Sequence, residues 1–316
     1  MPRLRSALAQ GALLAALALA IAFLYHNAAQ NLEARRIASG FAFLWREAGF
    51  EIGESTFLAY SALDSYLRAL LVGLANTFRV AAFGVVLAAL LGTLIGLARL
   101  APNWLLAKLA AAYVEIVRNV PLLVQLFFWY AVISDSLPAP AQALNPLPGV
   151  FLSNRGIFFP LPGDLPVLSG FNFAGGAALT PEFAALLIGL VTYTAGFIAE
   201  IVRAGILSVP RGQIEAAYSL GLVRRSAMRH VILPQALRMI VPPMTSQFLN
   251  LTKNSSLAVA IGYPDLVSIA NTTINQTGQA IEGIAIIMAV YLTISLSISA
   301  LMNWYNRRVA LRGTAR

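Results

Sequence analysis

The chain has 316 residues, of which 59% are hydrophobic and only 11% are charged. Soluble domains carry about 25% charged residues, so this composition excludes an ordinary soluble protein and indicates a membrane protein. Cysteine is absent and histidine occurs twice, which excludes disulfides, thiolate ligands and a histidine cluster, so we expect no metal site. The net charge is +9, and its distribution between loops predicts the orientation of the chain in a membrane.

Six apolar runs are long enough to cross a bilayer as helices, which need about 20 residues each. The first run, 7–25, follows Arg3 and Arg5 as a signal peptide would, but the residues after it make a poor cleavage site and favour an uncleaved span. The sequence therefore predicts an all-α fold of six transmembrane helices. The five later spans are expected at 67–98, 109–133, 182–202, 239–262 and 283–304.

The segments between the spans differ in character. Residues 26–66 mix both charges and are expected to form an external loop with an interfacial helix. Residues 134–180 are rich in Pro and Gly, so we expect turns there rather than a core. Within the second span, Gly92 and Gly96 form a small-xxx-small motif suited to close helix packing.

Six spans place both termini on one side of the membrane. If that side is the cytoplasm, 14 of the 22 Lys and Arg residues lie inside, and the two later external loops contain one cation, Arg155. Because cytoplasmic loops carry the excess of Lys and Arg, this orientation is predicted. The 14 residues are Arg3, Arg5, Arg99, Lys108, Arg203, Arg211, Arg224, Arg225, Arg229, Arg238, Arg307, Arg308, Arg312 and Arg316.

An Arg-rich segment lies between the fourth and fifth spans. Glu215 is expected to begin a short helix that includes Ala216 and Ala217. Gly221 permits a bend, Arg225 lies in the arginine-rich second part, and Pro234 marks the end of the segment. One alternative is a merely basic, amphipathic cytoplasmic loop. Another is a helix-turn-helix DNA reader, but the flanking runs are too apolar for a soluble domain, so no nucleic acid is expected.

This segment resembles the EAA loop of binding-protein-dependent ABC importer permeases, with Val231 where the family usually has Ile. The stretches 113–125, 199–203 and 251–257 resemble polar amino-acid permeases, and residues 154–156 (NRG) resemble general L-amino-acid uptake permeases. The resemblance covers about residues 60–305. It implies a type I ABC importer permease, with a span and periplasmic segment at 1–66, a core at 67–306, a coupling segment at 204–237 and a basic tail at 307–316.

The resemblance also implies partners and a role for the coupling segment. Its helices would sit in a groove on an ABC ATPase dimer, using Glu215, Ala216, Ala217, Gly221, Arg225 and Pro234. A second similar permease, a periplasmic amino-acid-binding protein and the lipid bilayer would complete the assembly in a bacterial inner membrane. The chain lacks the phosphate-binding motif GxxxxGK[ST], so ATP and Mg belong to the partner ATPase and this chain is not an enzyme.

Polar residues inside the spans are candidates for a substrate path, because burying them is costly unless they are paired or hydrated. In the fifth span they form one stripe that could hydrogen-bond an L-amino acid or, equally, join two permeases: Ser246, Gln247, Asn250, Lys253 and Asn254. In the third span Pro121 predicts a kink that frees carbonyls for a site, and Gln125 lies one turn beyond as a substrate contact. Glu115 with Arg118 and Glu200 with Arg203 are expected to be structural ion pairs.

Two rival classes are disfavoured. A Ser/Lys catalytic dyad would need Lys253 to face Ser255 or Ser256, but residues this close on one helix point apart. A secondary transporter would show repeated halves or paired broken helices, and the sequence has no such repeat.

Overall fold

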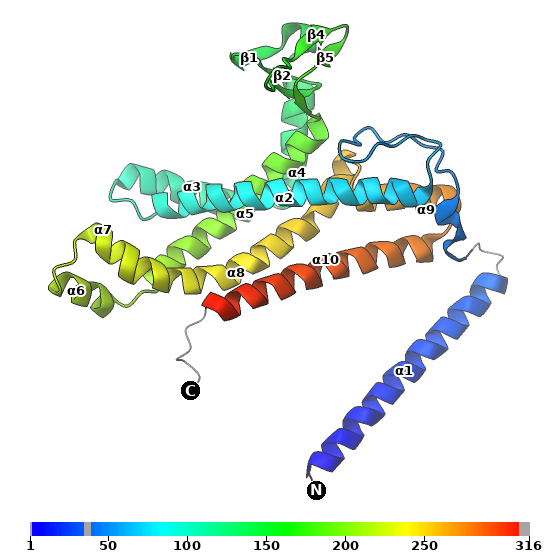
Figure 1. The fold of residues 1–316 in the computed structure, drawn as a ribbon, viewed down its shortest axis with the longest axis horizontal. Helices are drawn as coiled ribbons and strands as arrows, with labels where there is room; N and C mark the ends of the chain where they lie inside the picture. Colours follow the sequence, from blue (N-terminus) through cyan, green and yellow to red (C-terminus); the bar gives the residue numbers. More distant parts are fainter. Residues whose placement is uncertain (1, 35–38, 310–316) are drawn as a thin grey trace.

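The computed structural model describes residues 2–34 and 39–309 of the chain. Long helices dominate it, and a small sheet stands at one end (Figure 1). Three short 3-10 turns are η1 (Phe41–Trp45), η3 (Pro140–Gln142) and η5 (Ser255–Ile261), and two π-helical turns are η2 (Val132–Ser136) and η4 (Met228–Ile232). The α-helices are α1 (Pro2–Ala34), α2 (Tyr66–Ala98), α3 (Trp104–Asn119), α4 (Leu122–Ala131), α5 (Pro181–Leu207), α6 (Arg211–Ser219), α7 (Arg224–Ala227), α8 (Leu233–Asn254), α9 (Leu266–Thr277) and α10 (Ala280–Val309).

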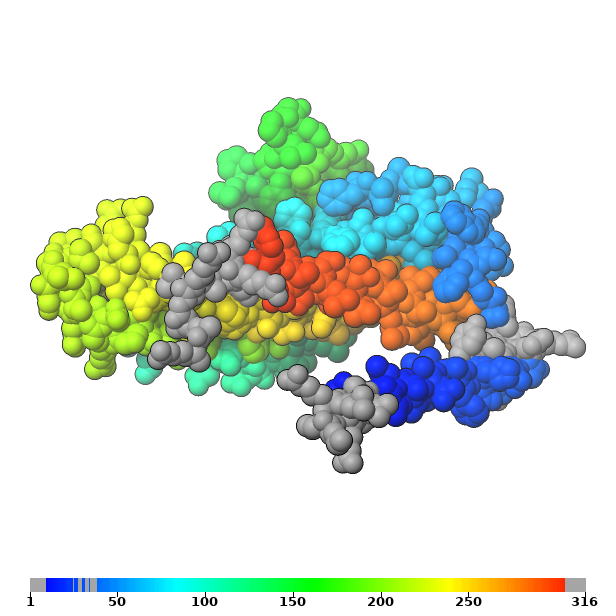
Figure 2. Space-filling model, turned by 60° about the horizontal axis from the view of Figure 1, so that its bottom comes forward, coloured from blue at the N-terminus to red at the C-terminus, as the bar shows by residue number. Residues whose placement is uncertain are grey.

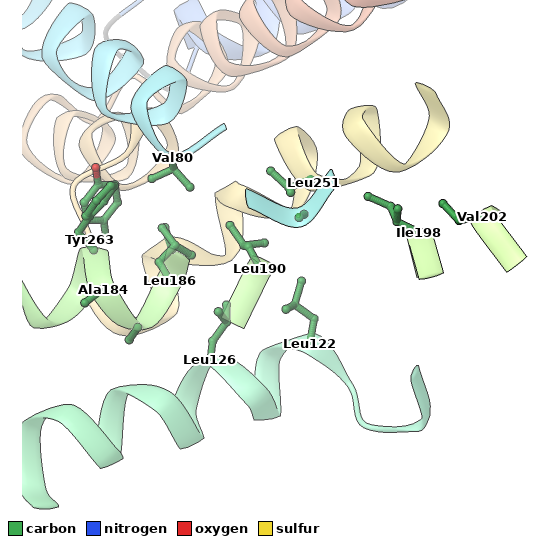
Figure 3. Close-up of a cluster of buried hydrophobic side chains, with 14 of the residues drawn as sticks. Val80, Leu122, Leu126, Ala184, Leu186, Leu190, Ile198, Val202, Leu251 and Tyr263 are labelled. Atoms are coloured by element: carbon green, nitrogen blue, oxygen red, sulfur yellow. The ribbon is translucent and has the colours of Figure 1, made fainter. Parts of the chain in front are cut away.

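The main core lies where α5 packs along α2. Gly92 and Gly96 allow this approach, since a Cβ on Gly92 would lie 2.6 Å from the Cβ of Ile198, and one on Gly96 would lie 2.7 Å from a backbone oxygen of α5. The expected close packing at this motif is confirmed. Leu186 and Leu190 of α5 are fully buried and meet side chains of α2, α4 and α8 in the same cluster (Figure 3).

The third expected span is a broken helix. α3 and the helix that follows it, α4 with η2, meet at an angle of 104°. Val120 is extended at the break, because a residue before proline is driven out of the helical region, and Pro121 caps α4. The kink expected at Pro121 is therefore a complete break.

Residues 134–180 contain strands, which corrects the expectation of turns without a core. The main sheet is antiparallel with order β1-β2-β3-β6, and β4 pairs with β5 in a separate hairpin. Phe173 stacks on Phe151 with ring centroids 4.5 Å apart and contacts the buried Phe158 at 4.9 Å, which gives this region its own small core. The strands are β1 (Leu144–Leu147), β2 (Val150–Ser153), β3 (Gly156–Phe159), β4 (Val167–Ser169), β5 (Asn172–Ala174) and β6 (Ala177–Leu179).

Residues 39–65 pack onto the N-terminal turns of α2 and α9. Phe43 and Ile52 are buried there in a second hydrophobic cluster, together with Tyr66. The helical structure in this region is the short 3-10 turn η1. Asn76 fixes the segment from within α2, because its side-chain amide donates to the carbonyls of Glu54 and Pro264.

By length and composition, α2, α5 and α10 can each cross a membrane, and the number rises to five if each of two bent helix pairs is one span. A sixth span would have to be α1, whose apolar stretch among residues with described side chains is Gln10–Leu24. This helix diverges from the bundle in Figure 1, and its described large apolar side chains are exposed. Of the predicted basic tail, residues 310–316 lie outside the described part of the chain.

Candidate functional site: the turn beyond α5 and the polar spans

The Arg-rich segment begins where α5 ends. α6 follows after Pro210 and stops at a glycine C-cap of the Schellman type. In this cap the N–H of Leu222 donates to the carbonyl of Ala217 at 3.1 Å, and the N–H of Gly221 donates to that of Tyr218 at 2.9 Å. Gly221 has φ +78°, a conformation that costs a side chain about 1–2 kcal/mol, so the predicted bend at this glycine is confirmed.

The turn between α6 and α7 exposes large apolar side chains. Leu220 is 82% exposed, Val223 68% and Tyr218 47%, whereas Ala217 faces inward. Figure 2 shows this segment, in yellow and yellow-green, protruding at one end of the molecule. A protruding apolar turn surrounded by exposed arginines is typical of a surface that docks into a partner.

Two expectations about this segment are corrected. Glu215 was expected to begin a helix, but α6 begins at Arg211, so Glu215 lies in the second turn, where the helix dipole has little effect on it. Pro234 was expected to end the segment, but it lies in the first turn of α8, and helical structure runs on from Arg224 through η4 to Asn254. The wider π-helical turn η4 precedes this proline.

Ion pairs tie the base of the segment to α2. Glu200 of α5 pairs with Arg203 at 2.5 Å, as expected, and also with Arg99 at the end of α2. The sequence did not single out Arg99 for this role, because 101 positions separate it from Glu200. The carboxylate thus joins two helix ends directly next to the segment that leaves α5.

The second expected ion pair, between Glu115 and Arg118, is not among the salt bridges of the part of the chain that the structure describes. The guanidinium of Arg118 instead lies over the ring of Phe197, 5.0 Å from its centroid. A cation is attracted to the face of an aromatic ring within this range. Glu115, Arg118 and Glu200 line one cavity of about 570 Å³ between α3 and α5.

Gln125 is held by the broken helix. Its side-chain amide is buried and donates to the carbonyls of Val117 and Val120 at 2.9 and 3.0 Å. These are the carbonyls that the break deprives of helix partners. The geometry therefore gives Gln125 a structural role and favours it over the expected substrate contact.

The polar stripe of α8 is open on one side. Asn250 and Lys253 are exposed, while Gln247 and Asn254 are partly buried. Pro242 and Pro243 lie in the same helix. Exposed amide and ammonium groups on a helix of this kind require water or a second protein surface, because lipid offers them no partner.

A buried ion pair that was not predicted joins the N-terminal half of α2 to the segment before it. Glu54 and Arg79 pair with side chains only 7% and 8% exposed, and the Thr180 hydroxyl donates to Glu54 at 2.9 Å. Arg79 also lies over the ring of Phe183, 4.0 Å from its centroid. Burial raises the pKa of Glu54, although the charge of Arg79 opposes the rise.

Comparison with known proteins identifies the family. The family model described as "Binding-protein-dependent transport system inner membrane component" matches residues 84–311. The chain belongs to this family. It is 47% identical to the putative amino-acid ABC transporter permease YhdX of Escherichia coli K12, over 92% of this chain and 90% of that protein. It is 43% identical to the general L-amino acid transport permease AapQ of Rhizobium johnstonii, over 90% of this chain and 87% of that protein.

A solved structure of this permease fold is also similar. It is the crystal structure of an amino acid ABC transporter with histidines, with a TM-score of 0.58 and 30% identity over 77% of this chain and 95% of that one. The chain is thus an integral membrane permease with the type I ABC importer fold. Members of the family are transport components, so no catalytic site is expected in this chain.

Proposed function

We propose that this permease forms the path for L-amino acid uptake in a bacterial inner membrane, driven by ATP hydrolysis on a separate ATPase subunit. The observation that carries the proposal is the apolar turn of Tyr218, Leu220 and Val223, which protrudes beyond α5 and is fixed by the cap at Gly221. Similarity to permeases named for amino-acid transport supports the substrate class.

The coupling segment would transmit motion through its fixed geometry. The ion pairs of Glu200 hold the base of the segment against α2, and the Schellman cap holds the turn. Closure of an ATPase dimer around this turn would therefore displace α5 and α8 as rigid elements. ATP and Mg remain on the ATPase in this proposal.

The substrate path is assigned to the polar face of α8, formed by Gln247, Asn250, Lys253 and Asn254. A second permease would face this stripe and enclose a hydrated space with it, since exposed polar groups in a span require such a partner. The similarity to GltJ and GltK, both glutamate/aspartate import permeases, supports a partner that is a related but different chain.

The orientation assigned is both termini in the cytoplasm, with α1 as a sixth span and the sheet outside. A periplasmic amino-acid-binding protein would then reach the sheet and residues 39–65. Affinity purification of this chain from its native membrane, followed by mass spectrometry, tests the assembly. We expect an ABC ATPase and a permease to copurify in stoichiometric amounts, and purification of the chain alone from a functional membrane would contradict the proposal.

A further inference from the structure

A cavity of about 420 Å³ lies at the foot of the sheet, where the sheet meets α4, η2 and the start of α5. Its walls include Tyr130, Ser134, Asn154, Arg155, Asn172 and Glu182. Cavities that bind small molecules measure about 300–1,000 Å³ and combine a shaped wall with a few polar groups. This cavity is separate from the polar stripe of α8 and from the cavity beside Phe197.

The cation in this cavity belongs to a residue whose backbone lies in a tight turn. Arg155 is the second of the two turn residues between β2 and β3, and its N–H donates to the hydroxyl of Ser153 at 3.2 Å. The next residue, Gly156, has φ +129°, and a Cβ there would lie 2.3 Å from the carbonyl oxygen of Leu179. Only glycine fits at this position, so the turn has little freedom to move Arg155 away.

The charge of Arg155 is available to a ligand. The residue is exposed, and it takes part in no salt bridge within the described ranges 2–34 and 39–309. It is also the one Lys or Arg residue between positions 119 and 202 of the sequence. A guanidinium without an ion-pair partner in a cavity wall can donate two parallel hydrogen bonds to a carboxylate.

The opposite charge comes from α5. Glu182 lies in the first turn of α5, and the hydroxyl of Tyr130 donates to one of its carboxylate oxygens at 3.3 Å. The other oxygen remains as an acceptor. The cavity therefore contains a cation and an anion that do not neutralise each other in an ion pair.

Asn154 supplies an acceptor without a donor. Its side-chain oxygen is one of two buried side-chain polar atoms that lack a hydrogen bond in the described part of the protein. Other protein atoms cover this oxygen, so the side chain must rotate before a ligand can reach it. The unsatisfied state favours that rotation, because a buried acceptor gains free energy by finding a donor.

We propose that this cavity is an external entry subsite for a zwitterionic α-amino acid. The carboxylate of the ligand binds Arg155, and its ammonium group binds Glu182 and the rotated amide of Asn154. The cavity would hold the solute between its release outside and its entry into the path along α8. This inference rests on the proposed function for the substrate class and for the side of the membrane on which the sheet lies.

Cysteine protection tests the subsite directly, because the chain has no native cysteine. The variant Ser134→Cys places a thiol in the cavity wall. The complete complex is reconstituted in nanodiscs without binding protein, and the rate of modification by a methanethiosulfonate reagent is measured. L-glutamate, L-glutamine and L-leucine are tested singly at millimolar concentrations, with glycerol as the control solute.

We expect at least one amino acid to slow the modification, and Arg155→Gln to raise the concentration needed by about tenfold or more, as expected for a lost charge-assisted hydrogen bond. Arg155→Lys should recover part of the protection. The matched control Arg46→Gln removes an exposed external cation that does not line the cavity, and protection should be unchanged.

Two results would overturn the subsite. One is a modification rate that no amino acid changes. The other is protection that requires the binding protein, which would make the cavity a docking surface for a protein instead. The proposed function has its own readout, which is ATP-dependent uptake of the same amino acids by the complex with the unsubstituted chain in proteoliposomes with binding protein. Failure of uptake with intact protection would contradict the function and leave the subsite in place.

Discussion

At the scale of single residues, Gly221 connects backbone geometry to coupling. Its φ of +78° completes the cap of α6, and no atom lies within 4 Å of where a Cβ would be. A side chain at this position would therefore strain the backbone and project from the protruding turn. These two effects can be separated, because asparagine tolerates a positive φ better than most residues.

We predict that Gly221→Asp leaves the chain in the membrane near its normal level but abolishes uptake and releases the ATPase. Gly221→Asn adds similar bulk without the charge and should retain an intermediate amount of ATPase. The measurement is the ATPase bound to affinity-purified permease, with labelled amino-acid uptake beside it. Full retention and full uptake in Gly221→Asp would mean that the turn is only a basic loop.

Glu54 and Arg79 form the second residue-scale test. Removing one partner of a buried ion pair costs about 3–5 kcal/mol, because the remaining charge stays buried without compensation. We expect Glu54→Gln to lower the thermal stability of the purified chain strongly. The double variant Glu54→Gln with Arg79→Met should recover much of the loss, and additive losses in the double variant would show that the two charges are not coupled.

At the scale of elements, the break between α3 and α4 explains the role of Gln125. Its amide replaces the helix partners of Val117 and Val120, so Gln125→Leu leaves two carbonyls unpaired, which costs about 1–3 kcal/mol each. We predict that this variant lowers the amount of assembled complex. The matched variant Asn250→Ala on the open face of α8 should lower uptake while assembly and basal ATP hydrolysis remain near normal.

The opposite pattern would reverse these assignments. Normal assembly with lost uptake in Gln125→Leu would place that residue in the substrate path, as its position in the sequence first indicated. Loss of assembly in Asn250→Ala would make the stripe on α8 an interhelical contact. The amount of assembled complex can be measured for both variants in affinity-purified samples.

The elements also show what sequence patterns can predict. Long apolar runs indicated the helices α2, α5 and α10, and the Gly92–Gly96 motif indicated close packing, because hydrophobicity and residue size are local properties. The pair Glu200–Arg203 was predictable because its members lie three positions apart on one helix. The additional partner Arg99 was not, since only the packing of α2 on α5 brings it near.

The sheet was missed for a different reason. The Pro and Gly content of 134–180 indicated turns, yet two apolar runs flank residues 154–156 (NRG), which is the pattern of a hairpin. The hydrogen bonds of Gln125 were not predictable either, because the sequence shows an amide in a span without showing the two carbonyls that accept from it. Polar residues in spans need their partners identified before a role can be assigned.

At the scale of the whole molecule, the cation asymmetry predicts orientation. Cysteines are best placed at exposed positions without positive φ, such as Leu165 in the sheet region and Gln213 in α6. We predict that Leu165→Cys reacts with an impermeant thiol reagent added to intact spheroplasts and that Gln213→Cys reacts only after lysis. Reversed labelling would place the sheet in the cytoplasm and contradict the assigned topology.

We propose that ATP hydrolysis on a partner subunit drives this permease. The most direct measurement is labelled amino-acid uptake into proteoliposomes that contain the complete complex and receive binding protein outside. One set contains ATP and no ion gradient, and the other contains an ion gradient and no ATP. We predict uptake only in the set with ATP, and loss of that uptake with Gly221→Asp. Uptake driven by the gradient without ATP would contradict it.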